Sequence, residues 1–248
     1  MNLIKQGKLA LAGVILAAGV GFSGCSDSTT AEGTANVQMS AEMDQGGVGA
    51  LAAVKGGAKT AAGNEVDSIY VTRIRLLISN LKMHEGNDDN ATDTTKDRTI
   101  KVGPFLVQYD SAGSHVFTNA SVPAGSYDRI KFEFHKLSNS EKDTYLNDPL
   151  FQDFVTDDRY TVIIDGWVWD AGVKSQFTYR SKVTDNLQVK FDPDLVLAEG
   201  TTTNLALQFS PKAVFKKGSS MPLDPRDGSN HSEMEKAIKD AIKVLKKG

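Results

Sequence analysis

Hydrophobic residues recur at every second position through most of the chain after residue 66, a period that is typical of half-buried β-strands. The clearest example is residues 127–137, where Ile130, Phe132 and Phe134 alternate with charged or polar side chains. One face of such a strand lies against a core, and the other faces water. The pattern therefore predicts a mainly β fold.

Further segments of this kind follow one another, with Gly, Pro, Asp and Asn residues between them. Residues 68–84 predict one long strand with a bulge, because the alternation changes register after Ile78. The other expected strands are residues 36–43, 99–110 with an interruption at Gly103 and Pro104, 115–119, 160–169, 174–183, 187–191 and 204–215. About nine short strands predict a two-sheet antiparallel sandwich, one domain at residues 36–220 with a Gly/Ala-rich loop at residues 44–64.

The end of the chain changes to a period of three and four, which predicts one C-terminal amphipathic helix over residues 229–247. Asn230 and Glu233 resemble a capping box at its start, and lysines gather near its end, where the helix dipole favours them. The apolar stripe comprises Met234, Ala237, Ile238, Ala241, Ile242 and Leu245. Three placements remain open for this helix: docked on the sandwich, bound to a partner or membrane surface, or frayed.

The first 25 residues have the layout of a bacterial lipoprotein export signal. Lys5 and Lys8 precede an apolar run at residues 9–20 that is too short to span a bilayer as a permanent helix, and a lipobox-like Phe-Ser-Gly-Cys ends at Cys25. Residues 1–24 are therefore expected to be removed as a signal peptide, and Cys25 to be lipidated. The alternative is an uncleaved signal anchor with an incidental cysteine.

Cys25 is the only cysteine, so the chain forms no intramolecular disulfide even if it is exported to an oxidising compartment. Several acyl chains on this residue, at about 0.8 kcal/mol per buried methylene, predict a permanent membrane anchor. Ser26 occupies the position where an aspartate favours inner-membrane retention, which favours the outer membrane, although Asp27 follows. The expected location is the cell envelope.

Loss of residues 1–24 leaves 26 basic and 31 acidic residues, a net charge of −5. A chain with this charge lacks the electrostatic attraction on which nucleic-acid binding depends. The small polar residues 25–35 predict a flexible tether between the lipid and the folded domain. The expected partners are therefore the membrane, through the lipid, and a protein or glycan at the envelope.

The sequence contains no recognisable catalytic or cofactor motif. Its four histidines, at positions 84, 115, 135 and 231, lack the spacing of a metal site. Neither a Gly-x-Ser-x-Gly motif nor a glycine-rich phosphate loop occurs, and a lipidated Cys25 is no nucleophile. We therefore expect a protein that is not an enzyme and binds no cofactor.

A turn with several oxygen ligands precedes the expected C-terminal helix. Asp224, Asp227 and Asn230 lie in the sequence LDPRDGSN, and a hard cation such as calcium prefers oxygen ligands on a tight glycine-containing turn. The same residue types are also common in any turn that leads into a helix cap. The sequence leaves both interpretations open.

Two tryptophans, Trp167 and Trp169, alternate on one strand face with Ile163 and Asp165, while valine and isoleucine side chains occupy the other face. If the aliphatic face belongs to the core, both indoles lie outward, as on a surface that stacks against sugars. The alternative buries them under the C-terminal helix or under the connection at residues 138–158.

The segments ISNLKMHE (78–85), VPAGSYDRIKFEF (122–134) and NLALQFSPKAVF (204–215) resemble an uncharacterised family of bacterial envelope lipoproteins. A P-A-G-x-Y turn launches a strand in that family, and Pro123, Ala124, Gly125 and Tyr127 match it. The resemblance implies an immunoglobulin-like or prealbumin-like sandwich and assigns no catalytic residue. The Gly/Ala-rich insertion and the helical tail depart from the family pattern.

Three functions fit these observations. The first is a non-enzymatic, lipid-anchored envelope protein that binds a ligand through its loops or builds envelope structure. The second is a glycan-binding surface module centred on Trp167 and Trp169. The third is a subunit of a fimbria-like assembly that exchanges strands through an exposed sheet edge.

Overall fold

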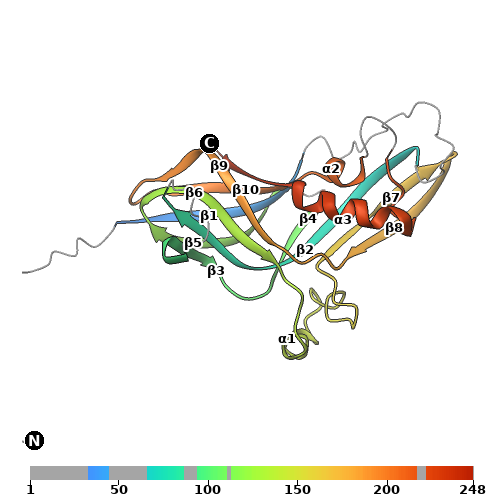
Figure 1. Cartoon of the computed structure of the whole chain (residues 1–248), viewed down its shortest axis with the longest axis horizontal. Coiled ribbons are helices and arrows are strands. Elements are labelled where there is room, and N and C mark those ends of the chain that lie inside the picture. Colours follow the sequence, from blue (N-terminus) through green and yellow to red (C-terminus); the bar gives the residue numbers. More distant parts are fainter. Residues whose placement is uncertain (1–32, 45–65, 87–93, 111–112, 217–221, 248) are drawn as a thin grey trace, which may run out of the picture. The chain divides into compact units, whose positions relative to one another are not determined.

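The computed structural model describes residues 33–44, 66–86, 94–110, 113–216 and 222–247 (Figure 1). The strands are β1 Thr34–Met43, β2 Ser68–Glu85, β3 Asp97–Lys101, β4 Phe105–Asp110, β5 His115–Pro123, β6 Gly125–Phe134, β7 Val162–Asp170, β8 Val173–Ser181, β9 Asn186–Leu197, β10 Thr202–Phe209 and β11 Ile242–Lys247. The helices are α1 Asn139–Tyr145, α2 Pro211–Phe215 and α3 His231–Asp240, with short 3-10 turns η1 Thr94–Lys96 and η2 Gly228–Asn230.

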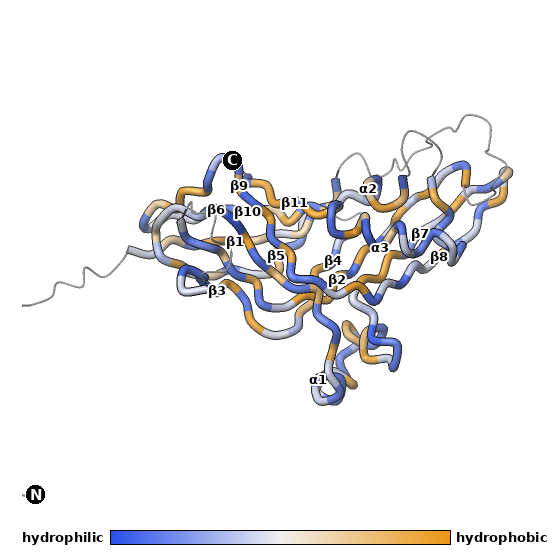
Figure 2. Tube along the Cα trace, viewed as in Figure 1, coloured by the Kyte–Doolittle hydropathy of each residue, from blue (hydrophilic) through white to orange (hydrophobic). Residues whose placement is uncertain are grey.

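These strands form two mostly antiparallel sheets, as the sequence predicts. The smaller sheet has the order β11-β10-β1-β5, in which β1 and β10 run parallel to each other. The larger sheet has the order β8-β7-β2-β6-β9, and β3 and β4 also pair with β2. Figure 2 shows apolar and polar residues alternating along these strands, which is the local pattern that makes each of them a strand with one buried face.

Strand β2 is the central strand of the larger sheet. Its first half pairs with β7 and its second half with β6, while β4 and then β3 pair with its other edge. The pairing with β6 changes register between Ser79 and Lys82, where Asn80 has a positive φ of 54°. This irregularity confirms the predicted bulge, and it lies close to the point where β2 passes from β7 to β6.

The two sheets share one hydrophobic core, which also receives the helices α2 and α3. Between the sheets, the ring of Tyr109 on β4 lies 5.7 Å from that of Phe209 on β10. Beside them, α2 and α3 cover the inner face of β8, where the ring of Tyr179 lies 6.3 Å from Phe215 and 5.1 Å from His231. Each sheet therefore buries one face, as in a sandwich-like packing.

A second, smaller apolar cluster lies under the connection that carries α1. Its buried members are Leu77, Leu137, Phe151, Phe154 and Ile163. The connection contains the short helix α1 and packs on the face of the larger sheet opposite to α3. Among the described residues, none of the helices has the length and hydropathy of a membrane span.

The predicted C-terminal helix over residues 229–247 is too long. Helix α3 ends at Asp240, and residues 242–247 form β11 along the edge of β10. The backbone N–H of Ala241 closes the helix by donating to Ala237 and Ile238. The next residues, IKVLKK, place β-branched side chains at alternate positions, so the open edge of β10 decides their structure. Of the three placements that the sequence left open for the helix, the structure shows the docked one, with α3 packed on the larger sheet.

Three other expected boundaries also differ from the structure. Residues 99–110 form two strands, β3 and β4, separated at Gly103 and Pro104. The strand expected at 204–215 ends at Phe209, because Pro211 begins α2 at a position where proline needs no backbone donor. The domain does not end at residue 220, since β11 belongs to the smaller sheet. The loop predicted at 44–64 lies, apart from Asp44, outside the described residues.

Candidate functional site

The residues predicted for lipidation and export, Cys25 and residues 1–24, lie outside the described part of the chain, as do residues 26–32 of the predicted tether. Strand β1 begins at Thr34, so the last two residues assigned to that tether already belong to the smaller sheet. Lipidation of Cys25 stays a prediction.

In the oxygen-rich turn before α3, the side chains form hydrogen bonds with one another and with the backbone of the turn. Arg226 donates to the carboxylate of Asp224, with Nη2 and Oδ2 2.8 Å apart, and Asn230 donates to the backbone oxygen of Asp224 at 3.0 Å. Asp227 caps η2 by accepting from the backbone N–H of Ser229 at 2.9 Å, and the hydrogen bonds from Ser229 hold the pKa of Asp227 below its ordinary value.

These contacts favour the turn interpretation over calcium, because a guanidinium already neutralises Asp224. Over the residues with described positions, no group of three or more His, Cys, Asp or Glu side chains is placed to hold a metal ion. The predicted capping box is wrong, since Asn230 makes no side-chain cap bond to α3.

The two tryptophans lie on the face of β7 that the alternation assigned to them. Trp167 is opposite Tyr70 of β2 and Gln176 of β8, and Trp169 is opposite Ser68 and Lys174. Both indoles are half-buried, whereas the other face of the strand, including Ile164 and Val168, is fully buried.

Burial of the indoles under the C-terminal helix is excluded by this arrangement, because α3 packs on the opposite face of β7 and β8. The connection that carries α1 shares the face of the indoles and covers its other end, where Phe154 packs near Ile163 and under Arg75. The structure therefore places Trp167 and Trp169 on a partly open sheet face with Tyr70. We call these three residues, with Lys174 and Gln176, the aromatic face.

Lys174 supplies a positive charge to the aromatic face. Its Nζ lies 4.3 Å from the ring centroid of Trp167 and 5.2 Å from that of Trp169. An ammonium in this position is attracted to the negative faces of the rings by about 0.5–1 kcal/mol at an exposed site. The interaction is weak enough for a ligand to displace, so both indoles and the ammonium are available to one ligand.

A rigid ion-pair network borders the aromatic face at Asp165, two residues before Trp167. The Asp165 carboxylate accepts hydrogen bonds from Arg73 at 3.0 Å, Arg75 at 3.2 Å and the hydroxyl of Thr178 at 2.9 Å. Two guanidinium groups converge on one carboxylate, and the Arg73 side chain is 45% exposed. Arg75 also pairs with Asp153, so the two arginines and two aspartates at the border of the aromatic face balance in charge.

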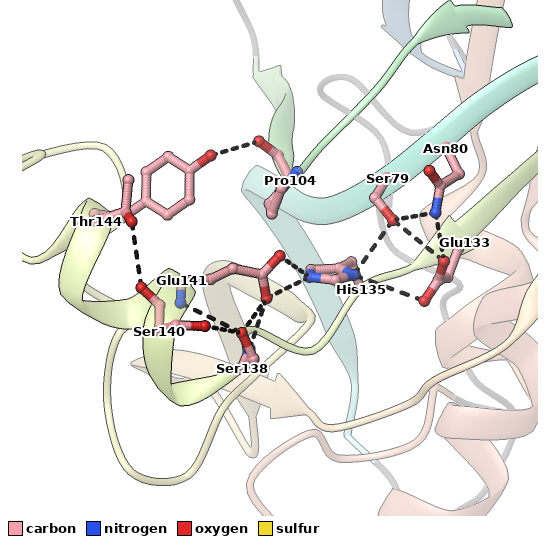
Figure 3. Close-up of polar contacts among 10 residues, drawn as sticks. Ser79, Asn80, Pro104, Glu133, His135, Ser138, Ser140, Glu141 and Thr144 are labelled. Atoms are coloured by element: carbon pink, nitrogen blue, oxygen red, sulfur yellow. Dashed lines mark hydrogen bonds and ion pairs between the residues drawn. The ribbon is translucent and has the colours of Figure 1, made fainter.

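A polar cluster around His135 was not predicted from the sequence (Figure 3). His135 Nδ1 lies 3.3 Å from the Ser79 hydroxyl, and its Nε2 lies 3.0 Å from both carboxylate oxygens of Glu141. Glu133 accepts a hydrogen bond from Asn80 at 2.9 Å and one from Ser79 at 3.3 Å. The cluster joins β2, the end of β6 and α1, and no sequence motif predicts contact between these segments.

The order serine, histidine, glutamate resembles the hydrogen-bond chain of a hydrolase triad. The surroundings oppose that chemistry. Ser79 is only 2% exposed, and its hydroxyl faces the Glu133 carboxylate, where a developing oxyanion would meet a negative charge. Glu141 is also the capping-box residue of α1, because it accepts from the backbone N–H of Ser138 at 2.8 Å. The hydrogen bonds of the cluster therefore hold α1 against the larger sheet.

We expect the cluster to stabilise the fold in a pH-dependent way. Burial raises the pKa of the Glu141 carboxyl, but hydrogen bonds from Ser138 and His135 outweigh burial and hold its pKa below the ordinary value. A lowered folded-state pKa gives stability that is present above the unfolded pKa and is lost as the pH falls through the folded one. Ser138→Ala should cost about 1 kcal/mol at pH 7 and less in acid.

Urea denaturation at pH 7 and at pH 3 measures this difference. The matched control is Asp143→Asn, which changes an exposed carboxylate of the same helix and should leave stability unchanged. An equal cost of Ser138→Ala at both pH values would contradict the role assigned to Glu141.

A second polar cluster lies deeper, between β2, β3 and β6. The Asp97 carboxylate bonds His84 Nδ1 at 2.9 Å and Lys131 Nζ at 2.8 Å, and the His84 side chain is fully buried. Asp97 is the first residue of β3. The three residues of this cluster come from segments that are far apart in the sequence, so no motif of fixed spacing predicts the cluster.

Comparison with known protein families, curated proteins and solved structures finds no match to this chain. The aromatic face therefore has to be interpreted from its own chemistry.

Proposed function

We propose that this chain is a non-enzymatic, lipid-anchored protein of the cell envelope that binds glycans through the aromatic face of β2, β7 and β8. The observation that supports this function best is the position of Tyr70, Trp167 and Trp169 on one partly open sheet face, opposite to the face that α3 covers. We propose an immunoglobulin-like or prealbumin-like sandwich as the type of fold, in line with the family resemblance at residues 78–85, 122–134 and 204–215.

Sugar rings suit such a face because their C–H groups pack on indole rings, while nearby polar groups bond their hydroxyls. Gln176 and Thr178 offer an amide and a hydroxyl on β8 beside Asp165 and Trp167. Lys174 adds a positive charge, so acidic sugars such as uronates gain an ion pair that neutral sugars lack. An acidic polysaccharide is therefore the ligand class that fits all of these groups.

The proposed location at the cell envelope follows from the lipobox at Cys25 and the small polar residues that come after it. A lipid anchor holds the domain at a surface, and weak contacts to a polymer then act together across many anchored copies. The pairing of a permanent anchor with a shallow aromatic face suits retention of a polysaccharide at the envelope.

Tryptophan fluorescence tests this proposal directly, because Trp167 and Trp169 are the only two tryptophans in the chain. Titration with sodium alginate, a polyuronate, should quench or shift the emission in a saturable way. Trp167→Ala should weaken binding about tenfold, as expected for loss of one stacking residue worth roughly 1–1.5 kcal/mol. Isothermal titration calorimetry measures the affinity of the variant.

Leu150→Ala is the control, because Leu150 is 64% exposed on the connection that carries α1 and lies outside the aromatic face. A neutral glucan should bind more weakly than alginate. Emission that no polysaccharide changes, with no heat of binding, would refute the glycan-binding proposal.

A further inference from the structure

The two sheets leave a groove between their last strands. Strand β11 ends the smaller sheet and pairs with β10, and β9 ends the larger sheet and pairs with β6. Between them lies a groove of about 440 Å³, lined by residues 189–195 of β9 and 243–246 of β11. Within the described ranges, no strand ladder joins β9 to β11, so two sheet edges face the same groove.

The floor of the groove is apolar and incompletely covered. Val189 and Phe191 alternate along β9 and pack against the main core, yet both are only half-buried, as is Val244 on β11. Apolar side chains at every second position are what one additional strand would cover with alternate side chains of its own. Fully paired strands elsewhere in the core show the contrast, since Ile74 on β2 and Ile164 on β7 are completely buried.

The walls of the groove are rich in lysine. Lys190, Lys243 and Lys246 line it and are exposed, with Asp192 and Asp194 at the turn of β9. Lysines at a sheet edge disfavour pairing with a second copy of the same edge, because equal charges then meet. They favour a strand that carries carboxylates.

Strand β11 is the better template of the two edges. Its ladder with β10 runs from Ile242 to Lys247 without a register shift. Strand β9 changes register opposite residues 127–129, and Pro193 lacks a backbone donor. A strand added beside β11 can therefore pair with an uninterrupted row of backbone N–H and C=O groups.

We propose that this groove binds an extended acidic peptide segment of another protein, which adds to the smaller sheet beside β11. Its apolar side chains enter the groove over Val189 and Val244, and its carboxylates, on the other face of the added strand, meet Lys243. This site is separate from the aromatic face, which lies on other strands, and neither proposal depends on the other.

Fluorescence anisotropy with the full, detergent-solubilised protein tests the proposal. The probe is a labelled heptapeptide, Asp-Val-Glu-Phe-Asp-Val-Glu, which alternates acidic and apolar side chains. It should bind saturably. The same peptide methylated at alternate backbone nitrogens, and a version with lysine at every acidic position, should each bind at least about tenfold more weakly.

The protein variant is Lys243→Glu, which reverses one exposed charge on the face that meets the carboxylates and should weaken binding of the acidic peptide about tenfold. The matched control, Lys236→Glu, makes the same charge change at an exposed position on α3 and should bind normally. Thermal melting checks that both variants are folded, and Trp167→Ala should leave peptide binding unchanged.

Four results would overturn the proposal: absence of saturable binding, equal binding of the methylated peptide, equal affinity of the Lys243→Glu variant, or polymerisation through this edge. Sedimentation velocity without peptide tests the last, since it would show that a second copy fills the groove.

Discussion

Asp97→Ala should lower the free energy of unfolding by about 3–5 kcal/mol, the cost typical of removing one partner from a buried ion pair. The carboxylate is 7% exposed and bonds Lys131, which is 14% exposed, and His84, which is fully buried. Its loss would leave two donors facing each other, with Lys131 Nζ only 3.1 Å from His84 Nδ1. Urea denaturation at pH 7 measures the change.

The pH dependence separates the charge of Asp97 from its packing. Burial raises the pKa of Asp97, but hydrogen bonds and charges from Lys131 and His84 outweigh burial, so its pKa lies below the ordinary value. The carboxylate therefore stabilises the fold above the unfolded pKa of about 3.9, and this contribution declines as the pH falls through the folded pKa. Asp97→Asn should differ from wild type at pH 7 and approach it in acid.

Asp157→Ala is the matched control for both measurements. Asp157 also pairs with a lysine, Lys142 at 2.8 Å, but its side chain is fully exposed, so its loss should leave stability unchanged. An Asp97→Ala protein as stable as this control would show that the cluster between β2, β3 and β6 contributes no stability.

Cys25→Ser should abolish membrane attachment. The hydroxyl cannot form the thioether to diacylglycerol, so the variant should accumulate as an unprocessed precursor and lack the fatty-acid label expected of the native chain. Metabolic labelling with palmitate and fractionation of envelopes measure both effects. The whole population should shift, because several acyl chains bind a membrane almost irreversibly.

Ser26→Ala is the control for this experiment, since it changes the neighbouring residue and keeps the thiol. It should be labelled and processed normally. A Cys25→Ser chain that is cleaved at the same site and still sediments with envelopes would show that residues 1–25 do not form a lipoprotein signal.

Much of the β-structure was predictable because strand alternation is a local property. Residues 68–84 form a strand with its register shift between Ser79 and Lys82, and the strand predicted at 127–137 is present but ends at Phe134. The errors occur where distant partners decide the structure. Residues 242–247 continue a helical pattern locally, yet the edge of β10, more than thirty residues earlier, converts them to a strand.

The candidate site, too, was predictable only where its residues lie on one strand. Trp167 and Trp169 were predictable as a pair because they lie on one strand and share a face. Lys174 and Tyr70 join them only through the register of β8 and β2, which a single sequence does not specify. The clusters around His135 and Asp97 were missed for this reason, since each gathers residues from three segments.

The parallel pairing of β1 with β10 joins Asn36 to Thr202 and Met43 to Phe209. The smaller sheet therefore cannot assemble until almost the whole chain has been synthesised, and pairing between such distant segments is slow. A nascent chain of this design stays without its final sheet during translation, which is the condition in which a protein passes unfolded through a secretion channel. The topology thus makes late folding an inherent property of this chain.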